Sequence, residues 1–368
     1  MSSKTSSRQH PVAWPLALCY GVGVRLRNLC FALGILPSES YPIAVICVGN
    51  LSAGGSGKTP LVEYLIRLLS PRYRVAVLSR GYKRKTKGYV VADESSTARE
   101  IGDEPCQMKR KYPTITVAVD ANRRRGMRRL LAMPDDVRPQ VVLLDDAFQH
   151  RYIRPSLAIL TTDYNRLFCH DHLLPVGTLR EPRSGVRRAD IVIVNKCDPT
   201  LKPIDYRIIE DEMKLNMAQS RFFTAVTYHR LEGVWPDECA PRELSTLTSD
   251  TDVLLLAGIA DPTPLINEMR RRTERVTPMI FSDHHAFTRN DMTKMRATLA
   301  KLSPNAVIVC TEKDATRLRI TPYYPSDLHA RTYALPIAIH FMFDTAARFD
   351  EIILRHVDTI EKSHILRR

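Results

Sequence analysis

The sequence has no closely spaced cysteine pair and too few acidic residues to balance its basic ones. Its eight cysteines lie far apart, which excludes a CxxC zinc site or a thioredoxin-type motif. Free thiols of this kind are typical of a reducing compartment, so we expect a cytoplasmic protein. With 54 Lys and Arg against 40 Asp and Glu, the formal net charge is +14, which favours an anionic partner. No zinc-finger or RNP signature accompanies the basic runs, so we expect no nucleic-acid partner.

The apolar N-terminal segment 11–36 also lacks an uncharged stretch long enough to cross a membrane. Its longest uncharged run, Pro11 to Val24, is 14 residues, and Arg25 and Arg27 then interrupt it. No clean small-residue cleavage site follows, so a signal peptide is not indicated. Large apolar residues recur at helical spacing, at positions 14, 18, 22, 26, 29 and 33. This pattern fits a helix lying at a membrane surface, and it fits equally a helix packed on the main domain.

The 368 residues suffice for two domains, and their apolar runs alternate between strand and helix patterns. Short β-branched runs, such as 43–48 and 141–144, are separated by helical patterns such as 123–131. This alternation predicts an α/β fold with a parallel sheet covered on both faces. A second, smaller α/β series follows a polar stretch at 199–203. We therefore expect three parts: an N-terminal helix region at 1–36, a main domain at 37–228 and a smaller C-terminal α/β domain at 229–368.

A glycine-rich loop between the first predicted strand and a helical pattern has the composition of a P-loop. In GNLSAGGSGKTP, backbone N–H groups near the glycines can converge on phosphate oxygens, Lys58 can reach the β and γ phosphates, and Thr59 can ligate Mg²⁺. A glycine turn with no nucleotide is the structural alternative. In the usual pattern, glycine stands where this chain has Ser52. The predicted nucleotide-binding residues are Ser52, Gly54, Gly55, Ser56, Gly57, Lys58, Thr59 and Pro60.

Two further strand ends carry candidate nucleotide-binding residues. The apolar run 141–144 leads into Asp145 and Asp146, and such a strand end can bring hard oxygen ligands to Mg²⁺, as in a Walker B motif. Which of the two acids would touch the metal stays open. NKCD, residues 195–198, follows another apolar run and matches the NKxD motif with which GTPases read guanine. It keeps a P-loop GTPase or a metal-insertion chaperone as the alternative function. Ordinary turn chemistry also explains NKCD, and an apolar run that ends in two aspartates can simply be a strand end.

Six further motifs follow one another along the chain: SRGYKR (79–84), GDEP (102–105), DDAFQHR (145–151), PVGTLREP (175–182), DHHAF (283–287) and TEKDA (311–315). With the phosphate loop, this ordered set resembles the tetraacyldisaccharide 4'-kinase family over roughly residues 10–345. The resemblance implies a P-loop NTPase-like α/β/α sandwich, a second smaller α/β/α domain and an N-terminal amphipathic, membrane-associated helix. It implies that ATP, with Mg²⁺, phosphorylates the 4'-hydroxyl of a tetraacyldisaccharide 1-phosphate in lipid A biosynthesis. The implied partners are this lipid precursor and the cytoplasmic face of the inner membrane, and we expect a monomer.

The same resemblance implies roles for individual residues. Asp103 of GDEP is the implied catalytic base, because a carboxylate can accept the proton of a sugar hydroxyl that attacks phosphorus. His284 is its implied partner, with His285 as the open alternative. TEKDA receives no role, and Asn122 precedes Arg123 where the family usually has Asp. The other implied residues are Lys58, Arg123 and Arg180 for phosphate charge, and Thr59, Asp145, Asp146, Gln149 and Glu181 near Mg²⁺.

Overall fold

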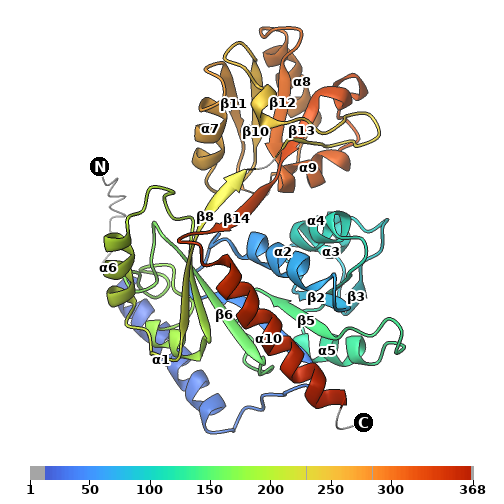
Figure 1. Ribbon diagram of the computed structural model, residues 1–368. Helices are drawn as coiled ribbons and strands as arrows, with labels where there is room; N and C mark the ends of the chain where they lie inside the picture. Colours follow the sequence, from blue (N-terminus) through green and yellow to red (C-terminus); the bar gives the residue numbers. More distant parts are fainter. Residues whose placement is uncertain (1–12, 229, 284, 366–368) are drawn as a thin grey trace.

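Two sheets, each covered by helices, organise the computed structural model, which describes residues 13–228, 230–283 and 285–365 (Figure 1). Among these residues the large sheet has nine strands, in the order β14 (Ile337–Phe341), β8 (Ser220–Tyr228), β7 (Ile191–Asn195), β6 (Leu157–Asp163), β1 (Ala44–Asn50), β5 (Val141–Asp145), β2 (Val75–Ser79), β4 (Thr116–Val119) and β3 (Val90–Val91). The strands from β8 to β4 are parallel, and the two edge strands are antiparallel to their neighbours. The predicted parallel α/β sheet is therefore confirmed.

Alternate residues of the central strands point into two cores on opposite faces of the large sheet. In β1, Val45 and Cys47 belong to one core, whereas Ile46 and Val48 belong to the other. Because both faces are covered, the strand carries apolar residues at every one of these positions. Packed on the first face are α5 (Arg123–Leu131) and α6 (Pro203–Met213), and on the second are α2 (Lys58–Leu69), α3 (Ala98–Ile101), α4 (Asp103–Lys111) and α10 (Ala346–Ile365).

The small sheet has the order β11 (Val276–Ile280), β10 (Val253–Ala257), β12 (Val307–Thr311), β13 (Thr332–Leu335) and β9 (Glu232–Gly233). Its strands are parallel except β9, which is antiparallel to β13. One face is covered by α7 (Thr263–Arg270), and the other by α8 (Arg289–Leu299) and α9 (Glu312–Arg319). The predicted second, smaller α/β/α layer arrangement is thus present.

Two paired strands connect the large and small units. Figure 1 shows β8 leaving the large sheet and β14 returning beside it, with Ile337 opposite Tyr228. The final helix α10 then buries Phe349, Ile353 and Val357 against the large sheet. Residues 337–365 therefore lie with the large sheet, and not with the rest of the expected C-terminal part 229–368. The cause is the apolar face of α10, which completes the core beside α2.

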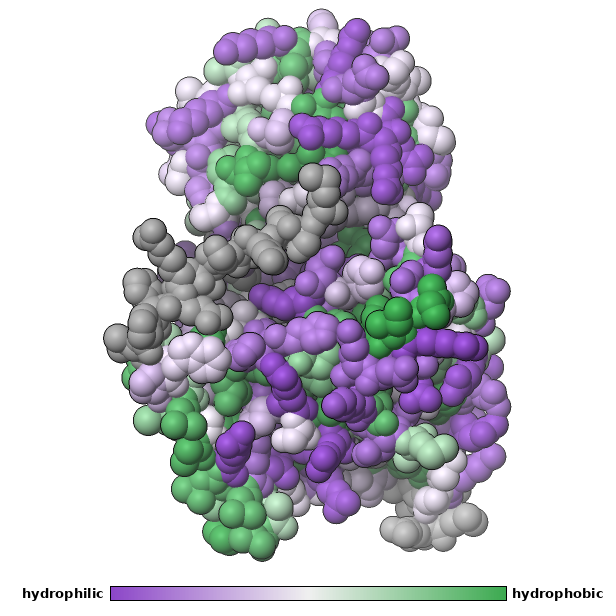
Figure 2. Space-filling view, turned by 90° about the vertical axis from the view of Figure 1, so that its left-hand side faces the viewer, coloured by the Kyte–Doolittle hydropathy of each residue, from purple (hydrophilic) through white to green (hydrophobic). Residues whose placement is uncertain are grey.

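Helix α1 (Ala13–Ala32) packs on the large unit through a narrow buried side. Ala17, Gly21 and Phe31 are buried, and the Phe31 ring meets Tyr152 edge-on at a centroid distance of 4.9 Å. The apolar side chains that remain exposed on and just after the helix are Trp14, Leu16, Leu18, Tyr20, Val22, Leu26, Leu29, Leu33 and Ile35. Figure 2 shows hydrophobic surface gathered at the lower end of the large unit, where α1 lies in Figure 1. Within the described ranges, no helix combines the length and apolar character needed to cross a membrane. Residues 1–12 of the predicted N-terminal part lie outside the described residues.

Candidate active site

The phosphate loop lies between β1 and α2, in the order that the sequence predicts. Gly57 is the residue before the helix, and its φ of 78° is in the left-handed region that glycine tolerates best. A Cβ atom at Gly57 would lie 2.7 Å from the Asn195 amide nitrogen, so a side chain there would also collide. Lys58 and Thr59 form the first turn of α2, where the positive end of the helix dipole favours an anion.

The backbone of the loop is fixed by side chains at the end of β7, which lies two strands from β1 in the large sheet. The Asn195 side chain donates to the Ser56 carbonyl oxygen at 2.7 Å, and Lys196 Nζ donates to the Gly55 carbonyl at 2.6 Å. Thr224 in turn donates to the Asn195 side-chain oxygen, so the asparagine is held from both sides. Asn195 and Lys196 therefore hold the backbone of the phosphate loop in place, and this role requires no guanine base.

The side chain of Asp198, the last residue of NKCD, is hydrogen-bonded within the turn that follows β7. Asp198 Oδ1 accepts hydrogen bonds from the Thr200 backbone N–H at 2.8 Å and from the Thr200 hydroxyl at 2.6 Å. This is ordinary turn chemistry for an aspartate that follows a strand. Within the described residues, the motif has the geometry of a loop support followed by a turn.

The PVGTLREP segment closes the other side of the phosphate loop. Ala53 N–H donates to the Thr178 carbonyl at 2.7 Å, and Arg180 N–H donates to the Leu51 carbonyl at 2.7 Å. Ser52 forms an isolated β-bridge with Leu179. Ser52 therefore serves to join the loop to this segment, although it stands where the usual pattern has glycine.

Asp146 links the two cations expected to meet phosphate. Lys58 Nζ lies 3.3 Å from Asp146 Oδ1, and Arg180 Nη1 lies 3.2 Å from Asp146 Oδ2. Burial acts to raise the pKa of Asp146, but Lys58 and Arg180 outweigh it and hold that pKa below its usual value. Asp146 therefore stays ionised and keeps both cations at the mouth of the phosphate loop.

Asp145 stands beside Asp146 but in a different electrostatic environment. Its side chain is buried, and the Ser79 hydroxyl donates to Oδ2 at 3.2 Å. Burial, followed by the charges of Glu104 and Asp146, raises the pKa of Asp145 to about 7. Oδ1 of Asp145 is buried and accepts no hydrogen bond from any described residue. A divalent cation would satisfy that oxygen and offset the clustered negative charge.

Two other predicted metal ligands, Glu181 and Gln149, differ in the hydrogen bonds that their side chains make. Glu181 is buried and pairs with Arg188 through Oε2, while its Oε1 has no hydrogen-bond partner among the described residues. The Gln149 amide nitrogen instead donates to the Asn50 carbonyl at 2.5 Å, so this side chain anchors the end of β1. This hydrogen bond does not use the Gln149 side-chain oxygen, which is the atom that a cation would bind.

Arg123 is buried directly behind the acidic strand end. Its guanidinium donates to the backbone carbonyls of Asp120 at 3.1 Å and Asp145 at 3.4 Å. Burial lowers the pKa of Arg123 to about 10, partly opposed by Asp145 and Asp146. The neighbouring His150 is neutral near pH 7, because burial and then Arg123 lower its pKa to about 4.

The GDEP acids begin α4 and face the small unit. Asp103 Oδ2 pairs with Arg317 Nη2 at 2.7 Å, and Glu104 Oε1 pairs with Lys313 Nζ at 2.6 Å. Burial alone would raise the pKa of Glu104, but Lys313 and then Lys58 bring it below its usual value. Glu104 thus connects the small unit electrostatically to the phosphate-loop lysine.

His284 lies outside the described residues, so its predicted pairing with Asp103 stays a prediction. The adjacent His285 forms a 2.9 Å hydrogen bond with Asp291, which also caps the start of α8. Arg317 was not singled out from the sequence. No motif marks it, because its contact with Asp103 joins residues 214 positions apart.

Helix α1 touches the same loops that form the site. The Tyr20 hydroxyl donates to the Arg180 carbonyl at 2.8 Å, and Arg27 donates to the Gln149 carbonyl at 2.5 Å. Arg151 donates back to the Asn28 carbonyl at 2.8 Å. The helix therefore both packs on the main unit and exposes an apolar side beside the site, so the two alternatives left open by its sequence pattern are compatible.

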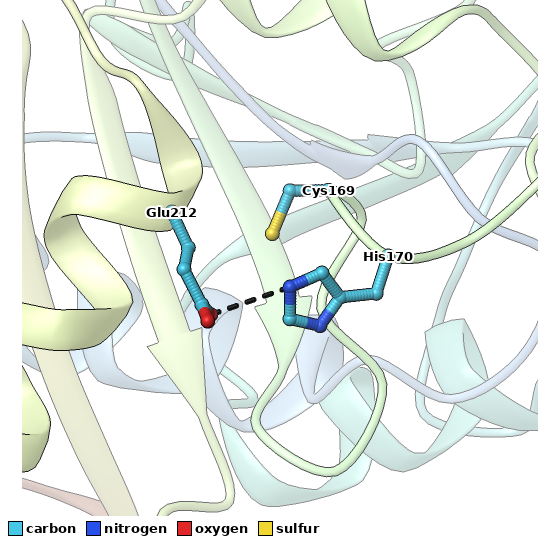
Figure 3. A group of neighbouring side chains, drawn as sticks. All are labelled: Cys169, His170 and Glu212. Carbon is cyan, nitrogen blue, oxygen red and sulfur yellow. Dashed lines mark ion pairs between the residues drawn. The ribbon is translucent and has the colours of Figure 1, made fainter.

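One further group of the described residues has donors suited to a metal ion: Cys169, His170 and Glu212. Their ligand atoms lie within 4.8 Å of one another, and His170 Nε2 is 3.3 Å from Glu212 Oε2. Figure 3 shows Cys169 and His170 on a loop, facing Glu212 on α6. All three are exposed or half-exposed, and none belongs to the predicted magnesium ligands.

Comparisons with known proteins identify relatives over almost the whole chain. The sequence matches the family model described as tetraacyldisaccharide-1-P 4'-kinase over residues 9–358. It is 52% identical over 351 residues to the tetraacyldisaccharide 4'-kinase of Parabacteroides distasonis, covering 95% of each chain. The same enzyme of Bacteroides thetaiotaomicron is 47% identical over 356 residues, covering 95% of this chain and 93% of the relative. The fold is similar to a crystal structure of LpxK from Aquifex aeolicus in complex with ATP, with a TM-score of 0.69, 26% identity, and coverage of 94% and 98%.

Proposed function

The chain belongs to the tetraacyldisaccharide-1-P 4'-kinase family, and we propose how its site transfers the γ-phosphate of ATP to the 4'-hydroxyl of a tetraacyldisaccharide 1-phosphate. The observation that carries the proposal is the junction at Asp146, where Lys58 and Arg180 converge beside the phosphate loop. Two cations on one carboxylate are well placed to move onto phosphate oxygens when a nucleotide arrives. The comparisons do not favour the GTPase or metal-insertion alternative.

ATP is the proposed phosphoryl donor. Its triphosphate would lie along the loop from Gly54 to Gly57, at the positive end of α2, as in other P-loop proteins. The relative from Aquifex aeolicus was crystallised in complex with ATP, and its fold covers nearly all of this chain. Lys58 and Arg180 then neutralise the charge that develops on the phosphoryl group during transfer.

Mg²⁺ fits the acidic end of β5. Asp145 Oδ1 and Glu181 Oε1, which have no hydrogen-bond partner in the described part of the chain, are hard oxygen donors. The Thr59 hydroxyl belongs to the usual ligand set of such a loop. When bound there, Mg²⁺ supplies charge neutralisation for the β and γ phosphates. The protein's own part is to hold these oxygens in place, with Ser79 fixing Asp145 and Arg188 fixing Glu181.

Asp103 is the proposed base, with His284 as its proposed partner. The Asp103 carboxylate takes the proton of the 4'-hydroxyl, while the new O–P bond forms and the bond between the γ-phosphorus and its bridging oxygen breaks. The products are ADP and the 4'-phosphorylated lipid. Asp103 begins α4, where the positive end of the helix dipole stabilises a carboxylate.

We propose that α1 docks the enzyme, as a monomer, on the cytoplasmic face of the inner membrane. Its exposed apolar side chains suit the acyl region, and the exposed Arg25 suits lipid phosphates. Contacts from Tyr20 and Arg27 to the site loops keep this face close to the phosphate loop. A lipid acceptor could then reach the site without leaving the bilayer entirely.

The test is transfer of radiolabelled γ-phosphate from ATP to a tetraacyldisaccharide 1-phosphate in mixed micelles. Wild-type protein should label the lipid, and Asp103→Asn should lower kcat by roughly 100-fold to 10,000-fold, the usual contribution of a general base. The matched control is Asp135→Asn, because the Asp135 side chain is 77% exposed and its pair with Arg138 is local. Wild-type turnover in Asp103→Asn would remove this residue from the base role, and an unlabelled lipid would refute the proposed acceptor.

A further inference from the structure

The helix that carries TEKDA meets the helix that carries GDEP across the two units. Figure 1 shows α9 of the small unit facing α4 of the large one. Two ion pairs join their functional ends, Arg317 with Asp103 at 2.7 Å and Lys313 with Glu104 at 2.6 Å. All four side chains are at most one-third exposed, so water screens these contacts less than it screens ordinary surface pairs.

A third ion pair closes the opposite end of the same contact. Lys111, the last residue of α4, lies 2.7 Å from Glu312 Oε1 and 2.6 Å from Glu63 Oε2. Burial, followed by the charge of Glu63, raises the pKa of Glu312 to about 7. This pair joins the two units through Lys111, Glu63 and Glu312, which makes it a suitable reference for contacts that hold the units together.

Arg317 is itself held rigidly by the small unit. Its Nη1 donates to the Gly258 carbonyl at 3.1 Å and to Asp314 Oδ1 at 3.0 Å. Asp314 is fully buried and also accepts from the Gly258 N–H at 3.0 Å and from the Thr311 hydroxyl at 2.7 Å. Contacts within the small unit therefore hold the orientation of the guanidinium that also meets Asp103.

Two other donors of Arg317 converge on one carboxylate oxygen. Nε lies 3.2 Å and Nη2 lies 2.7 Å from Asp103 Oδ2. Two donors on a single oxygen restrict the rotation of the carboxylate more than one flexible ammonium would. We propose that Arg317 is a positioning residue for Asp103, and that Thr311 and Asp314 of TEKDA form the support that holds this arginine at the active site. The inference rests on the proposed role of Asp103 as base.

This arrangement couples the meeting of the two units to the orientation of the base. When α9 lies against α4, the Asp103 carboxylate is held by a group from the other unit. Without that contact, the carboxylate regains rotational freedom, and a reacting group that is misplaced by about 1 Å can cost on the order of 100-fold in rate. The expected signature is a loss in kcat with little change in the affinity for ATP, because the hydrogen bonds described above join Arg317 to Asp103, Gly258 and Asp314 and not to the phosphate loop.

The experiment compares kcat and KM for ATP in Arg317→Met, Arg317→Lys and the reference variant Glu312→Gln. Arg317→Met should lower kcat by about 10-fold to 100-fold and leave the KM for ATP within about twofold. Arg317→Lys should recover part of the rate, because lysine keeps the charge but not the fixed pair of donors. Glu312→Gln should keep kcat within about threefold of wild type, because it weakens the contact between the units without touching Asp103.

A double-mutant cycle with Asp103→Asn separates positioning from general damage. If Arg317 acts through Asp103, then Asp103→Asn combined with Arg317→Met turns over at the rate of Asp103→Asn alone. Multiplied losses in the double variant would overturn the inference, and so would equal losses in Glu312→Gln and Arg317→Met. If Arg317→Met fails to fold by circular dichroism, the same cycle is run with Arg317→Lys. Full activity in Asp103→Asn would instead overturn the base role itself, which is a distinguishable result.

Discussion

Replacing Asp145 by Asn should remove the function of the site yet stabilise the metal-free protein at neutral and alkaline pH. The pKa of Asp145 rises from 3.8 to about 7 on folding, chiefly because the carboxyl is buried and then because Glu104 and Asp146 are near. The folded state therefore prefers the protonated form. The stability that this preference contributes is fully present below pH 3.8 and is lost as the pH rises through about 7.

The size of the effect follows from the two pKa values. At about 1.4 kcal/mol per pH unit, ionising Asp145 in the folded protein costs about 4 kcal/mol in total. About 3 kcal/mol of this total falls between pH 5 and pH 8. Asparagine cannot ionise, so Asp145→Asn should gain about 3 kcal/mol relative to wild type over that interval, while phosphate transfer is lost.

Urea denaturation followed by far-ultraviolet circular dichroism, without divalent ions, gives the free energy of unfolding at each pH. Asp135→Asn is the matched control and should show no such gain, because its side chain is 77% exposed. Adding Mg²⁺ at pH 8 should stabilise wild type more than Asp145→Asn, since a cation offsets the cost of the ionised carboxylate. If the free energy of unfolding changed with pH in the same way for wild type and Asp145→Asn, the argument would be refuted. Burial and neighbouring negative charge would then not raise the pKa of Asp145.

Three further predictions use other parts of the molecule. Lys58→Met should lower kcat by at least about 100-fold, because a cation at the transferring phosphate is lost, and steady-state transfer assays would contradict this if the rate were unchanged. Asp198→Ala should leave the preference for ATP over GTP unaltered, since Asp198 bonds to Thr200; a shift in that preference would revive guanine reading. Leu26→Glu should change the free energy of unfolding by less than about 0.5 kcal/mol, because Leu26 is 60% exposed, but should weaken binding to anionic vesicles at least about 10-fold in flotation assays. Undiminished flotation would show that α1 only packs on the protein.

Patterns along the chain were enough to predict the elements that carry the site. The run 43–48 is apolar at every position, which is typical of a parallel strand covered on both faces, and β1 occupies Ala44–Asn50. The phosphate loop follows it because glycine permits the left-handed turn before α2. By contrast, local patterns did not predict which residues form β8 and β14. Their residues mix polar and apolar types, and their pairing depends on the chain returning more than 100 residues later.

The sequence also could not show which role each residue of a motif has in the structure. NKCD matches a guanine-reading pattern, but Asn195 and Lys196 hold the phosphate loop. They can do so because β7 and β1 are parallel and lie two strands apart, so both strands end at the same edge of the large sheet. Gln149 is expected near the metal from the sequence, and the structure adds that its amide nitrogen donates to the Asn50 carbonyl. Hydrogen-bond partners of this kind depend on strand order, which local patterns do not encode.

The sequence by itself determined the α/β fold, the phosphate loop, the acidic strand end and the family, because each depends on residues that are neighbours in the chain. Only the tertiary structure decided that Asp145 and Asp146 differ in charge, since burial and the positions of Lys58 and Arg180 set their pKa values. Only the tertiary structure shows that Arg317 contacts Asp103, because this contact requires both sheets to fold and helices α4 and α9 to pack against each other. Chemistry that depends on adjacency could be predicted, whereas chemistry that depends on packing could not.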